Sequence, residues 1–393
     1  MKYRTESDFL GDKRIPDEFY YGINAVRGYE NFNITDDKTD IILIKTVAWV
    51  KKACALANLE CGALDKNISD AIITACDKIA GGDYNNQFIV NPIQGGGGTS
   101  LNMTANEIIA NIALEILGRE KGGYDIINPL DHVNMSQSTN DILPTAINLA
   151  LILKTEPLLN ALDIIKKTFA NKALESGTAM KMGRTHLNAA SPISYKQCFD
   201  VWSDIVSRDC ERIKNAADIL RIVPLGGTVI GTGLNTTSQY LKSVIEKLRQ
   251  VSGISVSACE NLADGIQNTD QYTALSSVLK VCMNNLSKIA SDLRFLGSEP
   301  QHGIGEIILP PRQLGSSIIN KKVNPVMAEF INHVYFLVCG YDLTVNMASQ
   351  AGQLELNVFK PTIAYCLFRS IDMMAGAINL FDKFCLKELK INN

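Results

Sequence analysis

The sequence predicts an all-α protein whose long helices form a bundle. Apolar residues recur at spacings of three and four through most of the 393 residues, which indicates helices with a buried face. Four of these segments are longer than ordinary globular helices, and such lengths are typical of bundles. Strand patterns are limited to short pieces at 87–90 and 307–309.

Three helices of ordinary length are expected in the first third of the chain. Apolar side chains line one face in residues 40–60 and again in residues 69–80. Gly81 and Gly82 follow the second of these segments and provide a stop signal. A third helix is expected over residues 103–117.

The four longest predicted helices make up the predicted bundle. Their apolar content exceeds what packing against one neighbouring layer requires, so part of their surface is expected to be buried against other subunits. They span residues 143–169, 193–220, 270–296 and 325–349.

Composition and charge exclude several function classes. The net charge is −3, from 38 basic and 41 acidic side chains, which argues against nucleic acid or an anionic membrane surface as a partner. No uncharged apolar run of about 18 residues occurs, so no membrane-spanning helix is predicted. The N-terminus has no apolar signal core. The ten cysteines form no Cys-x-x-Cys pair and are interpreted as buried free thiols, which favours a cytoplasmic protein.

Polar, glycine-rich loops separate the predicted helices. Their default role is to connect helices, but they concentrate serine, threonine and asparagine. Loops held by a rigid scaffold are where binding and catalytic residues gather. The loops span residues 95–100, 134–144, 183–191, 226–235 and 303–325.

Two of these loops have the composition of a ligand cradle. In residues 95–100 the glycines allow close backbone approach, and the following helix N-terminus favours an anion. No Gly-Lys-Ser/Thr follows, which excludes a Walker A loop, and a flexible connection explains the segment equally well. Residues 136–141 offer more hydroxyl and amide groups than the single one a helix N-cap needs.

Two further loops carry groups that can move protons. His186 has the side chain whose unperturbed pKa lies nearest neutrality, although a single loop histidine is more often structural. Residues 315–325 combine paired serines with a lysine that suits a carboxylate and with an asparagine. No Gly-x-Ser-x-Gly turn is present, which argues against a serine hydrolase.

Together these segments resemble the aspartase/fumarase superfamily. Residues 315–325 match its Gly-Ser-Ser-x-x-x-x-Lys-x-Asn-Pro signature, and residues 98–107 resemble its Gly-Thr-Ser-x-Asn-Met-x-x-Asn-Glu block. Residues 138–141 and 183–186 match two further blocks in the family order. The resemblance covers nearly the whole chain. Details in residues 267–270, 309–313 and 352–357, together with Thr139, are more similar to the aspartase branch than to the fumarases.

The resemblance implies a particular assembly. Family members are homotetramers whose long helices form a shared central bundle, with active sites where three subunits meet. We expect residues 1–138 to form a mostly helical N-terminal domain and residues 139–393 to form the central bundle domain. The small C-terminal helical domain of relatives is expected to be absent.

The resemblance also implies a reaction and a set of site residues. The family removes a proton next to a carboxylate, passes through an aci-carboxylate, and expels the group on the neighbouring carbon. Ser316 matches the base, His186 and Asn140 match residues near the leaving amino group, and Glu329 matches a carboxylate that orients the histidine. No metal or organic cofactor is expected. The residues that match carboxylate-binding positions are Thr99, Ser138, Thr139 and Ser317 for the β-carboxylate, and Thr185, Lys322 and Asn324 for the α-carboxylate.

Departures from the family pattern keep alternatives open. Residues 319–321 are Ile-Asn-Lys where the family has Met-Pro-Gly, and residues 188–190 are Asn-Ala-Ala instead of Gln-Asp-Ala. Lys196 and Lys360 replace a family Gly and Glu. The first interpretation is an ammonia-lyase acting on L-aspartate. One alternative is a fumarate hydratase or an amino-dicarboxylate lyase, and another is a catalytically weak paralogue with a structural or binding role.

Overall fold

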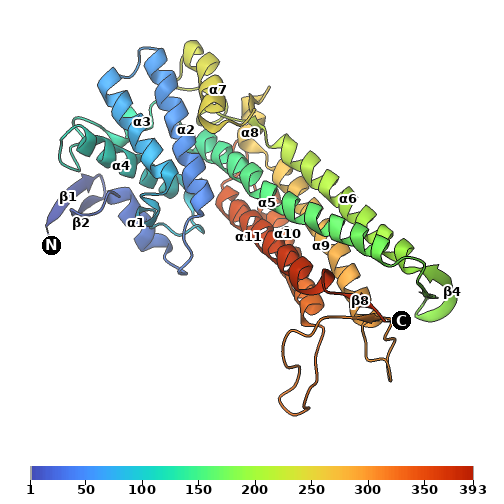
Figure 1. The fold of residues 1–393 in the computed structure, drawn as a ribbon. Coiled ribbons are helices and arrows are strands. Elements are labelled where there is room, and N and C mark those ends of the chain that lie inside the picture. The colour runs from blue at the N-terminus through green and yellow to red at the C-terminus, as the bar shows by residue number, and fades with distance from the viewer. Residues whose placement is uncertain (1, 393) are drawn as a thin grey trace. The chain divides into compact units, whose positions relative to one another are not determined.

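The computed structural model describes residues 2–392, and helices make up most of it (Figure 1). The all-α prediction is confirmed. Packing divides the chain into two compact units, each built from several stretches of sequence: unit 1 is Met1–Leu153, Ile219–Tyr272 and Thr344–Cys366, and unit 2 is Lys154–Asp218, Thr273–Leu343 and Leu367–Asn393. The sequence analysis expected two domains that are each continuous in sequence, with a boundary after residue 138. That division stays a prediction.

Two of the first helices of unit 1 begin directly after an aspartate whose side chain caps the first backbone N–H groups. Asp40 Oδ1 accepts from the Ile42 N–H at 2.8 Å, and Asp65 Oδ1 accepts from the Asn67 N–H at 2.8 Å. Gly82, with φ of 99°, ends the second of these helices. Helix α2 packs against α3 and α7, and α4 packs against α1 and α3 (Figure 1). The bounds are α1 Ile23–Phe32, α2 Ile41–Glu60, α3 Lys66–Gly81, α4 Thr99–Ile116, α7 Ser238–Ser252 and α8 Leu262–Gln267.

All four long helices predicted from the sequence are present. A further one, Lys360–Phe381, was not predicted. In unit 2, Leu279, Leu286 and Leu293 recur every seven residues along one face of their helix and are at most 1% exposed. The bounds are α5 Thr139–Glu175, α6 Tyr195–Ile219, α9 Asp270–Leu296, α10 Val326–Gln350 and α11 Lys360–Phe381.

Strands are short and occur in pairs, and two hairpins were missed by the sequence prediction. The strand expected at 307–309 is confirmed. The strand expected at 87–90 is wrong, because Asn85–Gln87 form a 3-10 turn and residues 88–90 form no strand. The missed hairpins are mostly polar and contain few apolar residues at every second position, so their sequences lack the apolar–polar alternation that signals a strand, even where burial alternates as in β1. The pairs are β1 Tyr3–Asp8 with β2 Gly11–Pro16, β3 Met180–Thr185 with β4 Asn188–Ser194, β5 Ile222–Val223 with β6 Ser257–Ala258, and β7 Ile307–Ile308 with β8 Lys390–Ile391.

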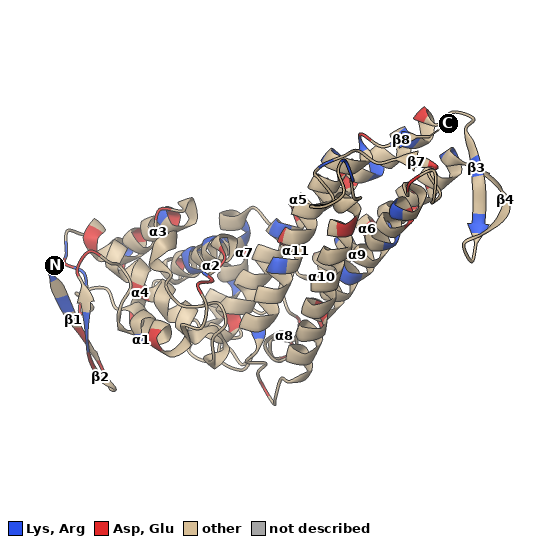
Figure 2. Cartoon of the chain, turned by 90° about the horizontal axis from the view of Figure 1, so that it is seen from below, with Lys and Arg blue, Asp and Glu red and all other residues tan. Residues whose placement is uncertain are grey.

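Two helical stretches are long and apolar enough to cross a membrane by length and composition, although the sequence analysis predicted none. They are Thr139–Glu175 and Lys360–Leu386. Most of each apolar window is buried inside the protein, as in the core helices of soluble proteins. Basic and acidic residues are interspersed along the helices (Figure 2), which agrees with the balanced charge of the sequence.

Candidate active site

The predicted site residues fall into two groups, one in each unit. Thr99, Ser138, Thr139 and Asn140 belong to unit 1. The second group belongs to unit 2 and comprises Thr185, His186, Ser316, Ser317, Lys322, Asn324 and Glu329.

The glycine-rich turn in unit 1 lies directly against α5. Gly96, Gly97 and Gly98 have φ of 80°, 65° and 93°, the left-handed region that side chains disfavour. A Cβ on Gly98 would lie 2.2 Å from a methyl carbon of Leu143 in α5. Thr99 follows as the exposed first residue of α4, and its hydroxyl donates to the Gly96 carbonyl at 2.8 Å. The turn therefore presents a hydroxyl at a helix N-terminus, where anions are favoured.

The segment before α5 is fixed by its own polar atoms. The Asn140 N–H donates to Ser138 Oγ at 3.3 Å, which caps the first turn of the helix. The Asn140 side-chain amide donates to the Val229 carbonyl at 2.7 Å. Thr139 is buried, with 8% of its surface exposed. This segment is therefore joined to the loop at 226–235, which the sequence analysis also singled out.

Asp141 is the buried carboxylate that holds these two loops together. It accepts from the backbone N–H groups of Ser138, Gly226 and Thr228 at 2.9, 3.0 and 3.1 Å. Burial raises its pKa to about 6, although these hydrogen bonds act in the opposite direction. The sequence analysis quoted Asp141 within a motif but gave it no role.

Lys51, which the sequence analysis did not select, lies buried beneath the same segment. Its Nζ donates to Asn134 Oδ1 and Gln137 Oε1, both at 2.8 Å. Asn134 Oδ1 also accepts from the amides of Asn102 and Asn106 of α4 at 3.2 Å. Burial lowers the pKa of Lys51 to about 7. One buried lysine thus connects α2 to the segment before α5 and, through Asn134, to the helix that begins at Thr99.

In unit 2, the segment predicted as a loop at 183–191 is part of a β-hairpin. Thr185 pairs with Asn188, so His186 and Leu187 form a two-residue turn. Their φ values of 52° and 63° are those of the type I′ turn that joins tightly paired strands. A Cβ on Gly183 would lie 2.5 Å from a carbonyl oxygen of the facing strand, which explains glycine there. Thr185 and His186 are exposed at the hairpin tip.

The serine loop is closed by contacts between its two ends. The Gly315 N–H donates to the Lys322 carbonyl at 2.7 Å, and the Asn324 side-chain amide donates to the Gly315 carbonyl at 3.0 Å. Ser317 and Lys322 are exposed. Lys321, where the family has glycine, is left-handed with φ of 63°.

Ser316 is half-buried within this loop, and its hydroxyl oxygen accepts two backbone hydrogen bonds. The donors are the N–H groups of Ile318 and Ile319, at 3.1 and 2.9 Å. Two donors aimed at one oxygen stabilise an alkoxide more than a hydroxyl, because the charged form is the stronger acceptor. The loop therefore favours deprotonation of Ser316.

Glu329 lies in the first turn of α10 and forms an ion pair with Arg294 at 3.5 Å. Arg294 also donates to Asn332 Oδ1 at 3.3 Å. Within residues 2–392, no hydrogen bond or ion pair joins Glu329 to His186, so the orienting role of Glu329 stays a prediction. Among these described residues, no three His, Cys, Asp or Glu side chains gather closely enough to hold a metal ion.

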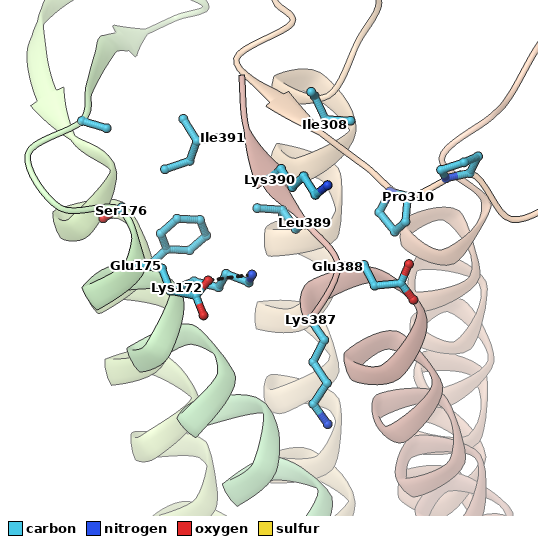
Figure 3. A pocket seen from close by; sticks show the side chains of 13 residues that line it. Lys172, Glu175, Ser176, Ile308, Pro310, Lys387, Glu388, Leu389, Lys390 and Ile391 are labelled. Atoms are coloured by element: carbon cyan, nitrogen blue, oxygen red, sulfur yellow. Dashed lines mark hydrogen bonds and ion pairs between the residues drawn. The ribbon is translucent and has the colours of Figure 1, made fainter. Parts of the chain in front are cut away.

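A pocket of about 720 Å³ in unit 2 lies apart from the predicted residues (Figure 3). Its walls come from the end of α5, from β8 and from the segment around Pro310. Phe199 and Leu389 contribute apolar surface, and Lys172 donates to Glu175 at 2.8 Å. None of the residues that line this pocket belongs to the predicted site.

Known proteins resemble this chain over its whole length. A family model described as Lyase matches residues 11–340. The aspartate ammonia-lyase of Bacillus subtilis (strain 168) is 49% identical over 391 residues, which is 100% of this chain and 82% of that protein. A crystal structure of fumarate lyase:delta crystallin from Brucella melitensis bound to cobalt superposes with a TM-score of 0.98 at 43% identity, and covers 100% of this chain and 85% of that one.

The similarity extends to more distant structures. Recombinant class II fumarase from Schistosoma mansoni superposes with a TM-score of 0.97 at 30% identity, and covers 100% of this chain and 85% of that one. The resemblance carried by the four sequence blocks is thus confirmed over the whole chain. The chain belongs to the aspartase/fumarase superfamily of lyases.

Proposed function

We propose that this protein is a carbon–nitrogen lyase that reversibly converts L-aspartate to fumarate and ammonia. The observation that carries the proposal is the 49% identity to an aspartate ammonia-lyase over 391 residues. Each side chain that the family resemblance links to a chemical step is also present, from Thr99 to Glu329.

Ser316 acts as the base in this proposal. Its alkoxide takes the β-proton of aspartate, and the C–H electron pair moves into the β-carboxylate to form an aci-carboxylate. When that pair returns to form the carbon–carbon double bond, the C–N bond breaks and its electrons leave with the nitrogen. Ser316 then returns its proton to the released ammonia. The N–H groups of Ile318 and Ile319 stabilise the alkoxide before the proton is taken.

The other residues bind the two carboxylates and the amino group. The hydroxyls of Ser138, Thr139 and Ser317 donate to the β-carboxylate, where negative charge accumulates. Thr99 joins them once its hydroxyl turns from the Gly96 carbonyl to the substrate. Thr185, Lys322 and Asn324 hold the α-carboxylate. Asn140 and His186 lie near the leaving amino group, and Glu329 orients the histidine. The reaction in this scheme proceeds without a metal or an organic cofactor.

A homotetramer completes the site by bringing loops of three subunits together. An exposed apolar stripe on α10 supports this assembly. Phe330, Phe336, Leu337 and Leu343 are 36%, 61%, 53% and 62% exposed, on a helix whose other face is buried. Such surface is unfavourable in water and is typical of subunit interfaces. Sedimentation at micromolar concentration should show a tetramer, and a well-folded monomer would rule out the shared site.

The reaction is tested by following fumarate absorbance with L-aspartate and, in parallel, with L-malate. The proposal requires fumarate from aspartate. Fumarate from malate alone would instead identify a fumarate hydratase, a candidate supported by the structural similarity to the class II fumarase. No product from either substrate would favour a paralogue with a binding role. We place the enzyme in the cytoplasm, because its ten cysteines are free thiols.

A further inference from the structure

Glu306 lies where several segments of unit 2 meet, directly before β7. Its backbone N–H donates to the Leu296 carbonyl at the end of α9, at 2.8 Å. Its own carbonyl accepts from the hydroxyl of Tyr195, the first residue of α6, at 2.6 Å, and from the Asn392 N–H at 3.0 Å. The backbone of Glu306 is therefore fixed to the ends of two long helices and to the segment that follows β8.

The side chain of Glu306 reaches from this fixed point to the β3–β4 hairpin. One carboxylate oxygen accepts from Arg184 Nη1 at 2.8 Å, and the other lies 3.1 Å from Lys181 Nζ. Both cations belong to β3. The three side chains are largely buried, with exposed fractions of 15% for Glu306, 24% for Arg184 and 7% for Lys181. Ion pairs shielded from water in this way are screened far less by salt than surface pairs.

The hairpin needs such an anchor. An isolated two-stranded hairpin is marginally stable in water, and residues 188–192 of β4 are all exposed. Apolar packing therefore contributes little to holding the tip in place. Arg184 directly precedes Thr185 and His186, so the position of the Arg184 backbone determines where those two residues lie.

We propose that Glu306 is a positioning residue for the lyase reaction: its ion pairs to Lys181 and Arg184 fix β3 to the helical scaffold and thereby place Thr185 and His186 against the substrate. This assignment rests on the proposed function. Glu306 touches no substrate in this scheme and acts only through the hairpin.

The test is Glu306→Gln, which keeps the shape of the side chain and removes its charge. KM for L-aspartate should rise about tenfold, because Thr185 contacts the substrate in both the ground state and the transition state. kcat should fall as well, by a smaller factor, because His186 near the leaving amino group is displaced with the hairpin. Glu306→Asp keeps the charge and should restore part of the affinity. Asp200→Asn is the matched control, because it removes the more exposed α6 ion pair to Lys196 and should leave KM unchanged.

Arg184→Gln removes the hairpin partner of the same ion pair. It provides the test if Glu306→Gln fails to fold. It should also raise KM. The increase in KM of the double variant should be smaller than the product of the two single increases. An active parent whose KM is unchanged in both variants would overturn the assignment. A loss of kcat that matches a loss of folded protein, with KM unchanged, would also overturn it. A parent that forms no fumarate would instead overturn the proposed function, before any variant is compared.

Discussion

The two polar segments that carry serine residues of the site, 134–141 and 315–324, are held in opposite ways. Side chains buried in the core fix the first, chiefly Lys51 and Asp141. The second closes on itself through contacts between its own ends, and its tip is open to solvent, with Ile318 92% exposed. The first segment is therefore held by the core, whereas the tip of the second is constrained mainly by contacts within its own loop.

This difference matches the two tasks that the proposed reaction sets. Donors that stabilise charge in the transition state are most effective when they are already in place, because no reorganisation is then needed. A loop that carries the base must instead admit substrate and afterwards exclude water. Changes in the serine loop should therefore alter rates, whereas changes beneath the 134–141 segment should alter stability.

The largest effect is expected for Ser316→Ala. The substitution removes the oxygen that accepts the β-proton but hardly changes the volume of the side chain. Because general-base catalysis typically contributes about 10²–10⁴-fold, kcat should fall by at least about two orders of magnitude. Binding of a dicarboxylate, measured by calorimetry, should persist. A variant as active as the parent would refute the assignment of the base.

The next largest effect is expected for Lys322→Ala. Its ammonium forms no ion pair within residues 2–392, so it is available for the α-carboxylate. Removing one partner of a charge pair that becomes desolvated should lower kcat/KM by roughly 30-fold or more. The variant should sediment like the parent. Lys321→Ala is the adjacent control and should keep substrate affinity. Equal affinities for the parent and Lys322→Ala would show that another group holds the carboxylate.

A smaller effect, on stability rather than rate, is expected for Lys51→Met. The pKa of Lys51 is about 7 in the folded chain and 10.5 when unfolded, so above pH 7 only the unfolded chain keeps this proton. The free energy of unfolding of the parent should therefore increase as the pH rises above 7, and Lys51 contributes up to about 1.4 kcal/mol per pH unit to this increase. Asp141, with a pKa of about 6, titrates below a window of pH 7–9. Cys54 has an ordinary pKa of 9.0 and a folded pKa of about 12, so its unfolded form starts to ionise near pH 9 and opposes the Lys51 contribution there. The parent and the variants share Cys54, so the comparison of their slopes isolates Lys51.

Urea unfolding at pH 7 and pH 9, at one protein concentration, measures this slope. Lys51→Met should lose that contribution. The neighbouring Lys52→Met should keep it, because Lys52 pairs with Asp77 near the surface. If all three proteins show the same slope, Lys51 does not titrate within the buried network.

The sequence predicted the helices well because their signal is local. Helical spacing of apolar residues located α9 at its observed bounds and α6 and α10 to within two residues, whereas α5 extends four residues before and six residues beyond its predicted range. The β3–β4 hairpin was not predicted because its side chains are mostly exposed and β4 shows no apolar–polar alternation. Family blocks supplied candidate site residues that spacing alone did not distinguish from helix caps.

Residues that support the site were harder to find, because their partners are distant in the sequence. Lys51 and Lys52 are adjacent, yet one is buried and binds Asn134, while the other reaches Asp77. The periodicity does not say which of two neighbouring lysines points inward. Glu306 likewise has no local signal, because its partners in β3 lie more than 100 residues away.

The smallest expected effect separates the two segments most sharply. Lys321 and Ser136 are both left-handed, with φ of 63° and 62°, a conformation that costs a non-glycine residue roughly 1–2 kcal/mol. Glycine relieves that strain but also increases the freedom of the unfolded chain, and the two effects nearly cancel. Ser136 additionally donates from its hydroxyl to Asn58 Oδ1 at 2.9 Å, whereas Lys321 lies exposed in the serine loop. Ser136→Gly should therefore lower Tm by a few degrees, and Lys321→Gly should leave Tm unchanged. If the strain at Lys321 slows closure, Lys321→Gly should raise kcat about two- to threefold in the parent. It should have no effect on Ser316→Ala, where closure is no longer limiting. Equal losses of Tm in both glycine variants would show that the serine loop is as firmly built into the fold as the 134–141 segment.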